Sequence, residues 1–156
     1  MKFMKPICAA AVLSCLMAFP SFAAETAEEY RTEAAVIQNE MKALEEEITP
    51  LKEENADISE KYSAVKAAWK EGQSLSISEE NWEKARELRH EIKSVRETLS
   101  GISAKGQRAS IKTAVQNGEY DSALAAMDQL LESKKAALEP TKQINAIWKQ
   151  IEELLG

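Results

Sequence analysis

The sequence predicts an all-α fold, an elongated antiparallel three-helix bundle with coiled-coil-like packing. Apolar residues recur every three or four positions over long stretches, as one face of a helix requires. Charged residues make up 29% of the chain, while Gly and Pro number only five and four, so long stretches contain nothing that breaks a helix. Turn signals at Gly72 and Gly118 divide the chain into three helices of roughly forty residues, each about 60 Å long.

The first 23 residues have the pattern of a secretory signal peptide. Two lysines precede an apolar run over residues 7–19, which is too short to span a bilayer, and Ser21-Phe22-Ala23 follows it. Small side chains before the cut favour cleavage between Ala23 and Ala24. This predicts an exported protein, periplasmic or extracellular, with a single all-helical domain over residues 24–156.

Both cysteines of the chain, Cys8 and Cys15, lie in this leading segment. Acylation of Cys15 in a lipoprotein is the alternative interpretation, but Leu13 is large for the position that such a signal requires. Cleavage after Ala23 removes both thiols, so the mature chain is expected to be stable by packing alone, without a disulfide.

The first predicted helix covers about residues 26–71. Its apolar stripe keeps one heptad phase from Ala27 to Trp69, and Asn55 is the only polar residue on it. A lone Asn in a coiled-coil core sets the register of packing, so Asn55 is predicted to be register-setting. Pro50 lies off the stripe, and because the phase continues past it, a kinked continuous helix is expected.

The second predicted helix covers about residues 78–117. Gly72 ends the preceding helix, and Ser76 or Ser78 caps the new one. The apolar stripe of this helix fades and changes phase between two glycines, which predicts a break near residues 101–106.

The third predicted helix covers about residues 119–155 and is expected to kink at Pro140. A shift of ninety residues aligns it with the first helix, placing Pro140 on Pro50 and Asn145 on Asn55. An ancient duplication and coincidence both explain this echo. In either case Asn145 takes a stripe position and is predicted to be register-setting, as Asn55 is.

Composition argues against several functional classes. The formal net charge of −6 disfavours nucleic acid and anionic membrane surfaces as partners, and no later segment is apolar enough to span a membrane. His90, the only histidine, falls at an outward heptad position. With one histidine and no cysteine after the predicted cleavage site, the chain lacks the ligands of a usual zinc site and offers little for Ser-His or Cys-His catalysis. The glycines are too scattered for a phosphate-binding loop. We expect no enzyme, no metal and no cofactor.

Charged residues form two series that could pair between helices. An acidic series recurs every seven residues on the first helix, and a basic flank follows one side of the second. The series are Glu33, Glu40, Glu47 and Glu54, and Arg86, Arg89, Lys93 and Arg96. Intramolecular pairing between them is plausible, but the sequence does not fix the individual pairs.

The tryptophans are the remaining candidates for a functional role. Trp69 and Trp148 lie on apolar stripes and are expected to pack in the core. Trp82 lies beside its stripe near the start of the second helix. It either covers the connection over residues 72–78 or is exposed as a partner contact, because aromatic anchors dominate protein interfaces.

Residues 77–92 resemble a segment of a known family. Ile77-Ser78-Glu79-Glu80-Asn81 and the following Lys84 to Ile92 look like the LTxxQ motif and its helix in Spy-like periplasmic chaperones. Ile, Ser and Asn stand where that motif has Leu, Thr and Gln, and a second copy, typical of the family, is not found. The resemblance implies an exported, all-α, cradle-shaped dimer that holds unfolded clients without ATP.

Two functions remain in competition. The leading hypothesis is an exported, non-enzymatic helical protein that binds another protein or an envelope component through its helical surface. The alternative is an ATP-independent Spy-like periplasmic chaperone or stress-binding protein. The expected partner is accordingly a folded protein or an unfolded client, and a homodimer is compatible with both.

Overall fold

The computed structural model of the protein describes residues 24–73, 75–102 and 106–156, which form four α-helices and no strand. The helices are α1 (Ala27–Lys70), α2 (Glu79–Gly101), α3 (Gln107–Asn117) and α4 (Tyr120–Leu155). The all-α class is confirmed. Four helices replace the three expected, because α2 and α3 are separate where the break was predicted. Residues 1–23, with the predicted signal peptide and Ala23, lie outside the described residues.

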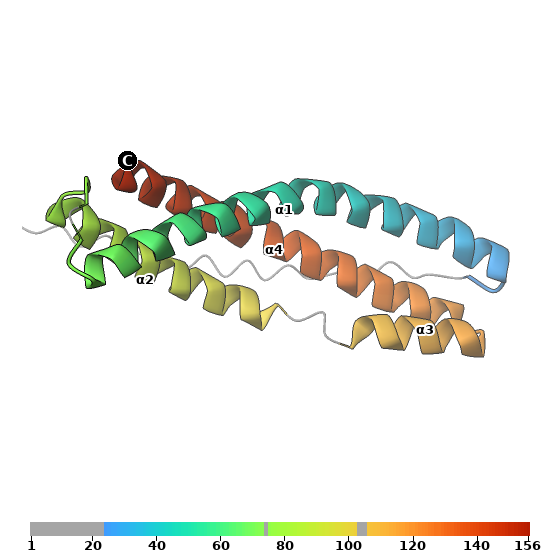
Figure 1. Cartoon of the computed structure of the whole chain (residues 1–156). Coiled ribbons are helices and arrows are strands. Elements are labelled where there is room, and N and C mark those ends of the chain that lie inside the picture. The colour runs from blue at the N-terminus through green and yellow to red at the C-terminus, as the bar shows by residue number, and fades with distance from the viewer. Residues whose placement is uncertain (1–23, 74, 103–105) are drawn as a thin grey trace, which may run out of the picture.

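The four helices lie along one long axis (Figure 1). α1 and α4 run in the same direction, while α2 and α3 follow one another in the opposite direction. α4 packs against all three other helices. No Cα atom of α1 lies within 8 Å of a Cα atom of α2 in the described chain, so these two helices do not pack backbone to backbone. α4 is therefore the central element of the fold.

Local sequence sets where the helices begin and end. Thr26 accepts a hydrogen bond from the backbone of Glu29, whose carboxylate accepts one from the backbone of Thr26, which is a capping box. Ser78, one of the two predicted caps, accepts a hydrogen bond from the Asn81 backbone nitrogen at 3.2 Å. Gly118, with φ of 75°, ends α3 in a left-handed conformation that favours glycine.

Pro50 and Pro140 lie inside α1 and α4, which continue through them as predicted. Beside Pro140, the Thr141 hydroxyl donates to the carbonyl of Ala137 at 2.7 Å. Bonds of this type often accompany a bent helix. The kink at each proline stays a prediction.

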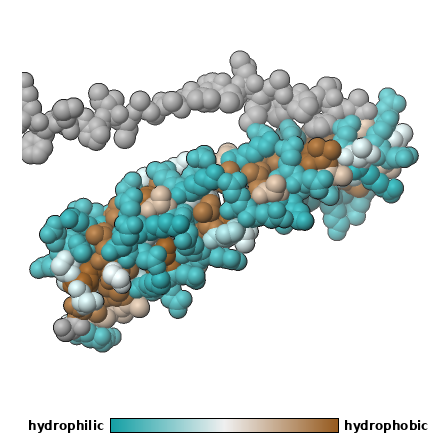
Figure 2. All heavy atoms as spheres, turned by 90° about the horizontal axis from the view of Figure 1, so that it is seen from above, coloured by the Kyte–Doolittle hydropathy of each residue, from teal (hydrophilic) through white to brown (hydrophobic). Residues whose placement is uncertain are grey.

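The predicted apolar stripes are the faces that become buried, in two separate clusters. The aromatic core joins α1, α2 and α4, and the N-terminal core joins the first halves of α1 and α4. The buried members of the aromatic core are Ile58, Tyr62, Trp82, Ala85, Ile92, Val95, Ile144, Ile147, Trp148 and Ile151. Those of the N-terminal core are Ala24, Ala34, Ile37, Leu124, Met127 and Leu131. The face seen in Figure 2 is largely hydrophilic, with apolar patches at several places along the length of the molecule.

Trp82 belongs to the aromatic core and is only 4% exposed. Its ring is stacked on Tyr62 at a centroid distance of 5.2 Å and on Trp69 at 5.7 Å. The interpretation of Trp82 as an exposed partner contact is therefore wrong. Its position beside the stripe of α2 directs the ring toward α1, whereas the stripe itself packs on α4. Trp69 and Trp148 pack in the same core, as predicted.

We expect Trp82→Ala to lower the free energy of unfolding by about 3–5 kcal/mol, because it removes the ring that joins α2 to α1. Urea denaturation followed by far-UV circular dichroism measures this. The control Val36→Ala removes a side chain that is 57% exposed and should change stability by less than about 0.5 kcal/mol. Equal midpoints for the two variants would contradict a structural role for the stacked rings.

Candidate functional site

α1 and α4 pair along a seam in which residues ninety positions apart lie side by side. At one end the rings of Tyr30 and Tyr120 are stacked, with centroids 5.3 Å apart. In the middle, Nδ2 of Asn145 donates a hydrogen bond to Oδ1 of Asn55 at 3.1 Å, and both side chains are buried. The ninety-residue echo of the sequence thus corresponds to lateral pairing, as in a parallel two-stranded coiled coil.

The acidic series of α1 pairs with lysines of α4. Three of its four carboxylates each reach a lysine ninety-five positions later, which is the spacing of interhelical charge pairs in a parallel coiled coil whose equivalent residues are ninety apart. The fourth, Glu33, has Asp128 at that spacing. The pairs are Glu40–Lys135 at 3.3 Å, Glu47–Lys142 at 2.6 Å and Glu54–Lys149 at 3.1 Å. These side chains are 42–52% exposed, so solvent weakens each pair. The suggested pairing with the basic flank of α2 is therefore wrong.

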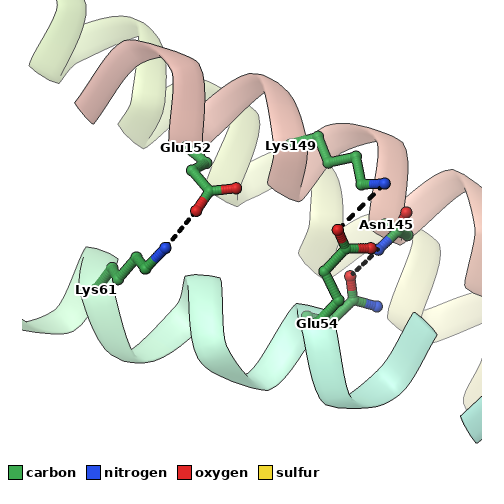
Figure 3. A network of polar contacts seen from close by, with 6 residues as sticks. Glu54, Lys61, Asn145, Lys149 and Glu152 are labelled. Carbon is green, nitrogen blue, oxygen red and sulfur yellow. Dashed lines mark hydrogen bonds and ion pairs between the residues drawn. The ribbon is translucent and has the colours of Figure 1, made fainter. Parts of the chain in front are cut away.

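Glu54 connects the asparagine pair to this ladder of charges (Figure 3). Its two carboxylate oxygens accept from Asn145 Nδ2 at 2.7 Å and from Lys149 Nζ at 3.1 Å. The hydrogen bond from Asn145 and the contact with Lys149 lower the pKa of the Glu54 carboxyl below its usual value. Two turns further on, Lys61 pairs with Glu152 across the same seam. A shift of one helix along the other would break all of these contacts together.

The asparagine pair can be tested as a register constraint. Asn55→Leu leaves the buried amide of Asn145 with Glu54 alone, and we expect it to lower the free energy of unfolding by about 1–3 kcal/mol. Replacing both residues by Leu removes the unpaired group, so stability should return to the wild-type value or exceed it. The double variant should also give a broader mass distribution in light scattering, because apolar seams tolerate slipped and oligomeric pairings.

The control for this experiment is Asn39→Leu, on the exposed face of α1, which should change neither stability nor mass. Wild-type stability of the single variant Asn55→Leu would contradict a structural role for the pair. An unchanged mass distribution of the double variant would contradict its role in setting the register.

The basic flank of α2 does not take part in the ladder of ion pairs but lines a groove. Three adjoining pockets, of about 640, 380 and 440 Å³, lie between α1 and α2 over α4. They are continuous because neighbouring pockets share wall residues, Ser59 and Ser63 in one case and Lys52 and Leu99 in the other. We call this feature the α1–α2 groove.

The groove exists because α1 and α2 both pack on α4 and touch one another mainly through the aromatic stack at one end. Its α1 wall carries small side chains, Ala56, Ser59 and Ser63, which leave the space open. Leu99 of α2 and Ile144 of α4 contribute apolar surface to it. The groove therefore combines a partly apolar lining with polar walls.

The charge lining the groove is predominantly positive. Apart from Lys134, which pairs with Glu45, six basic side chains line it, namely Lys52, Lys66, Arg86, Arg89, Lys93 and Arg96. None of the six forms an ion pair within residues 24–73, 75–102 and 106–156. The lining also includes two carboxylates, Glu60 and the Glu45 that pairs with Lys134. Cations outnumber the carboxylates there, in a chain whose net charge is −6.

Two of the arginines of the groove interact with neighbouring groups. The guanidinium of Arg89 lies 5.4 Å from the centre of the Trp148 indole, a cation–π contact. Partial burial and the nearby charge of Arg89 lower the pKa of Arg96, whose guanidinium nevertheless stays charged at neutral pH. The structure thus places Arg89 and Arg96 close enough for their like charges to influence one another.

His90 is exposed at the edge of the groove, as expected for a surface histidine. Within the described segments, no group of three or more His, Cys, Asp or Glu side chains is arranged to hold a metal ion. No helix in those segments combines the length and apolar character needed to cross a membrane.

Comparison with protein-family models, characterised protein sequences and solved structures finds no significant match. The resemblance to Spy-like chaperones therefore depends on residues 77–92 alone. In the structure this segment starts α2, where Ser78 is the N-cap and Ile77 packs against the aromatic core. Helix initiation accounts for these residues without reference to a chaperone function.

Sequence reasoning found the basic residues on the α2 wall of the groove but not those on the α1 wall. The spacing of Arg86, Arg89, Lys93 and Arg96 indicated one face of a helix. A second signal was available in Lys52, Ser59 and Lys66, which repeat every seven residues along α1 and line the opposite wall. Only the separation of α1 from α2 shows that the two series face a common space.

Proposed function

We propose that this chain is an exported, non-enzymatic binding protein and that a partner protein binds in the α1–α2 groove. The observation that carries this proposal is a partly apolar groove lined by six basic side chains that form no ion pair with any residue the structure describes. Elsewhere, along the α1–α4 seam, cations are matched with carboxylates. The groove is therefore the surface on which a partner would supply the opposite charges.

The form of the groove suits a helix of the partner. An amphipathic helix lies in a groove between two helices by placing its apolar face on the apolar lining and its polar flanks on the rims. Leu99 and Ile144 supply apolar lining here, and burial of such surface stabilises a complex by about 25 cal/mol per Å² before the cost of association. The charged rims then determine orientation and selectivity.

Export is the second part of the proposal and is supported by the leader pattern that ends at Ala23. The mature chain would begin at Ala24, which is 5% exposed and belongs to the N-terminal core. Its compartment would be the periplasm or the medium. Within it, α1 and α4 would be bent at Pro50 and Pro140, and α2 and α3 together would form the antiparallel helix of the predicted bundle.

A Spy-like chaperone is the second candidate function. The observation that favours it is the position of residues 77–92, because α2 forms one wall of the same groove. The two candidates differ in the occupant: one folded partner in the first case, and many unfolded proteins in the second.

A photo-crosslinking amino acid at Ser63, inside the groove, should label a defined partner in an envelope extract, whereas the same group at Lys112 on α3 should not. Unlabelled wild-type protein should compete. Ala56→Trp, which fills the groove, should fail to compete, while the matched variant Gln116→Trp on the exposed face of α3 should compete normally.

Equal labelling from both positions, or normal competition by Ala56→Trp, would contradict binding in the groove. Competition by several unrelated unfolded proteins would favour the chaperone over the specific partner.

A further inference from the structure

The α1–α2 groove also indicates the chemistry of its occupant, and this inference rests on the proposed function. We propose that the groove binds an acidic amphipathic helix of a partner protein. Its Glu or Asp side chains would form ion pairs with the basic residues of the walls, which have none among the described residues, and its apolar side chains would cover Leu99.

Charge complementarity is the first step of the argument. Arg86, Arg89 and Lys93 line the half of the groove nearest the aromatic core, with Lys66 on the opposite wall. Arginine presents a planar fork of donors that matches a carboxylate, and such pairs strengthen where water is partly excluded. Carboxylates spaced three or four residues apart on a helix would match cations with the same spacing on α2.

The apolar lining distinguishes a protein helix from other polyanions. A sulfated polysaccharide or a phosphate-rich polymer would satisfy the basic walls but would leave the partly exposed side chain of Leu99 in contact with water. An anionic membrane would meet the acidic exterior of a chain whose net charge is −6. An acidic amphipathic helix suits both the walls and the lining.

The test uses the mature chain and a fluorescent synthetic helix with Leu on one face and Glu on the other. We expect this peptide to bind at least about tenfold more tightly than a counterpart with Gln in place of Glu, and the difference should shrink as salt is added. Fluorescence anisotropy measures both affinities. Equal affinity of the two peptides would overturn the acidic chemistry.

Charge reversal in the groove provides the matched comparison. Arg86→Glu with Lys93→Glu should weaken binding of the acidic peptide at least about tenfold. Arg31→Glu with Lys112→Glu makes the same change in net charge on exposed residues outside the groove and should weaken it less than about threefold. Equal losses in the two double variants would show a general charge effect and overturn the proposal.

Two further probes separate the possible sources of negative charge. Tighter binding of a sulfated polysaccharide or of phosphatidylglycerol vesicles, lost in the groove variant, would overturn the assignment to a protein helix. If the acidic peptide fails to bind while Ser63 still crosslinks a partner, only the acidic chemistry is wrong. If both fail, the groove is not the binding site.

The N-terminus of the described chain carries a second, independent inference. The backbone nitrogen of Ala24 lies 2.8 Å from Oδ1 of Asp121, in the first turn of α4. We infer that cleavage after Ala23 forms an ion pair here. Hydrolysis by a signal peptidase leaves the Ala23 carbonyl as a carboxylate on the departing leader, and the nitrogen of Ala24 becomes an ammonium facing Asp121.

This ion pair would bind the start of α1 to the start of α4. Ala24 is almost fully buried, and its neighbours in the N-terminal core include Leu124, one turn after Asp121. An ammonium donor adds a Coulombic attraction to the Asp121 carboxylate that the neutral amide N–H lacks. Removal of the leader would therefore tighten this end of the molecule.

Chains beginning at Ala24, with a free or an acetylated amino group, test this inference. Asp121→Asn should lower the Tm of the free chain by several degrees and that of the acetylated chain by clearly less. Equal decreases would overturn the ion pair. Mass spectrometry of the exported protein tests the cleavage separately, and a mature chain that begins elsewhere would overturn it.

Discussion

The in-register pairing of α1 with α4 is the constraint on which the rest of the structure depends. It is fixed at one buried point by the hydrogen bond between Asn55 and Asn145, and it is repeated outward by ion pairs of constant spacing. Polar groups buried in a seam disfavour every alignment that would leave them unpaired. Once this alignment is set, the apolar residues on either side of the asparagines form two separate cores, and the remaining face of α4 is available for α2 and α3.

The central position of α4 explains the open groove. The surface of one helix is limited, and that of α4 contacts three other helices, so α1 and α2 pack on different sides of it. In a compact bundle those two helices would also pack against one another, at an axial distance of about 8–10 Å. Here they meet through Tyr62, Trp69 and Trp82 and then separate, which leaves small side chains of α1 opposite arginines of α2.

Periodicity predicted the helices and their buried faces well, because each stripe depends on local sequence and one packing partner. Caps and breaks at Ser78, Gly118 and near residues 101–106 were also local signals. The ion-pair partners of charged residues could not be predicted from local sequence, because Glu47 could reach Arg89 or Lys142 depending on which helices lie next to α1. Trp82 was ambiguous for the same reason: a residue beside a stripe is exposed in a two-helix contact and buried when a third helix covers it. Three-dimensional adjacency, not chemistry, was the missing information.

The division of the interior into two cores implies that the two ends of the molecule differ in mechanical character. The aromatic core is closed by two long helices and most of α2, with Trp148 and Ile151 fully enclosed. The other end relies on α1, α4 and the eleven-residue α3, which has no side-chain cap at its start. Helices of that length are marginal on their own. Amide hydrogens of α3 should therefore exchange through local opening, whereas those around Trp148 should exchange only on global unfolding. The end of the molecule that carries the basic walls of the groove then behaves as the rigid cooperative unit.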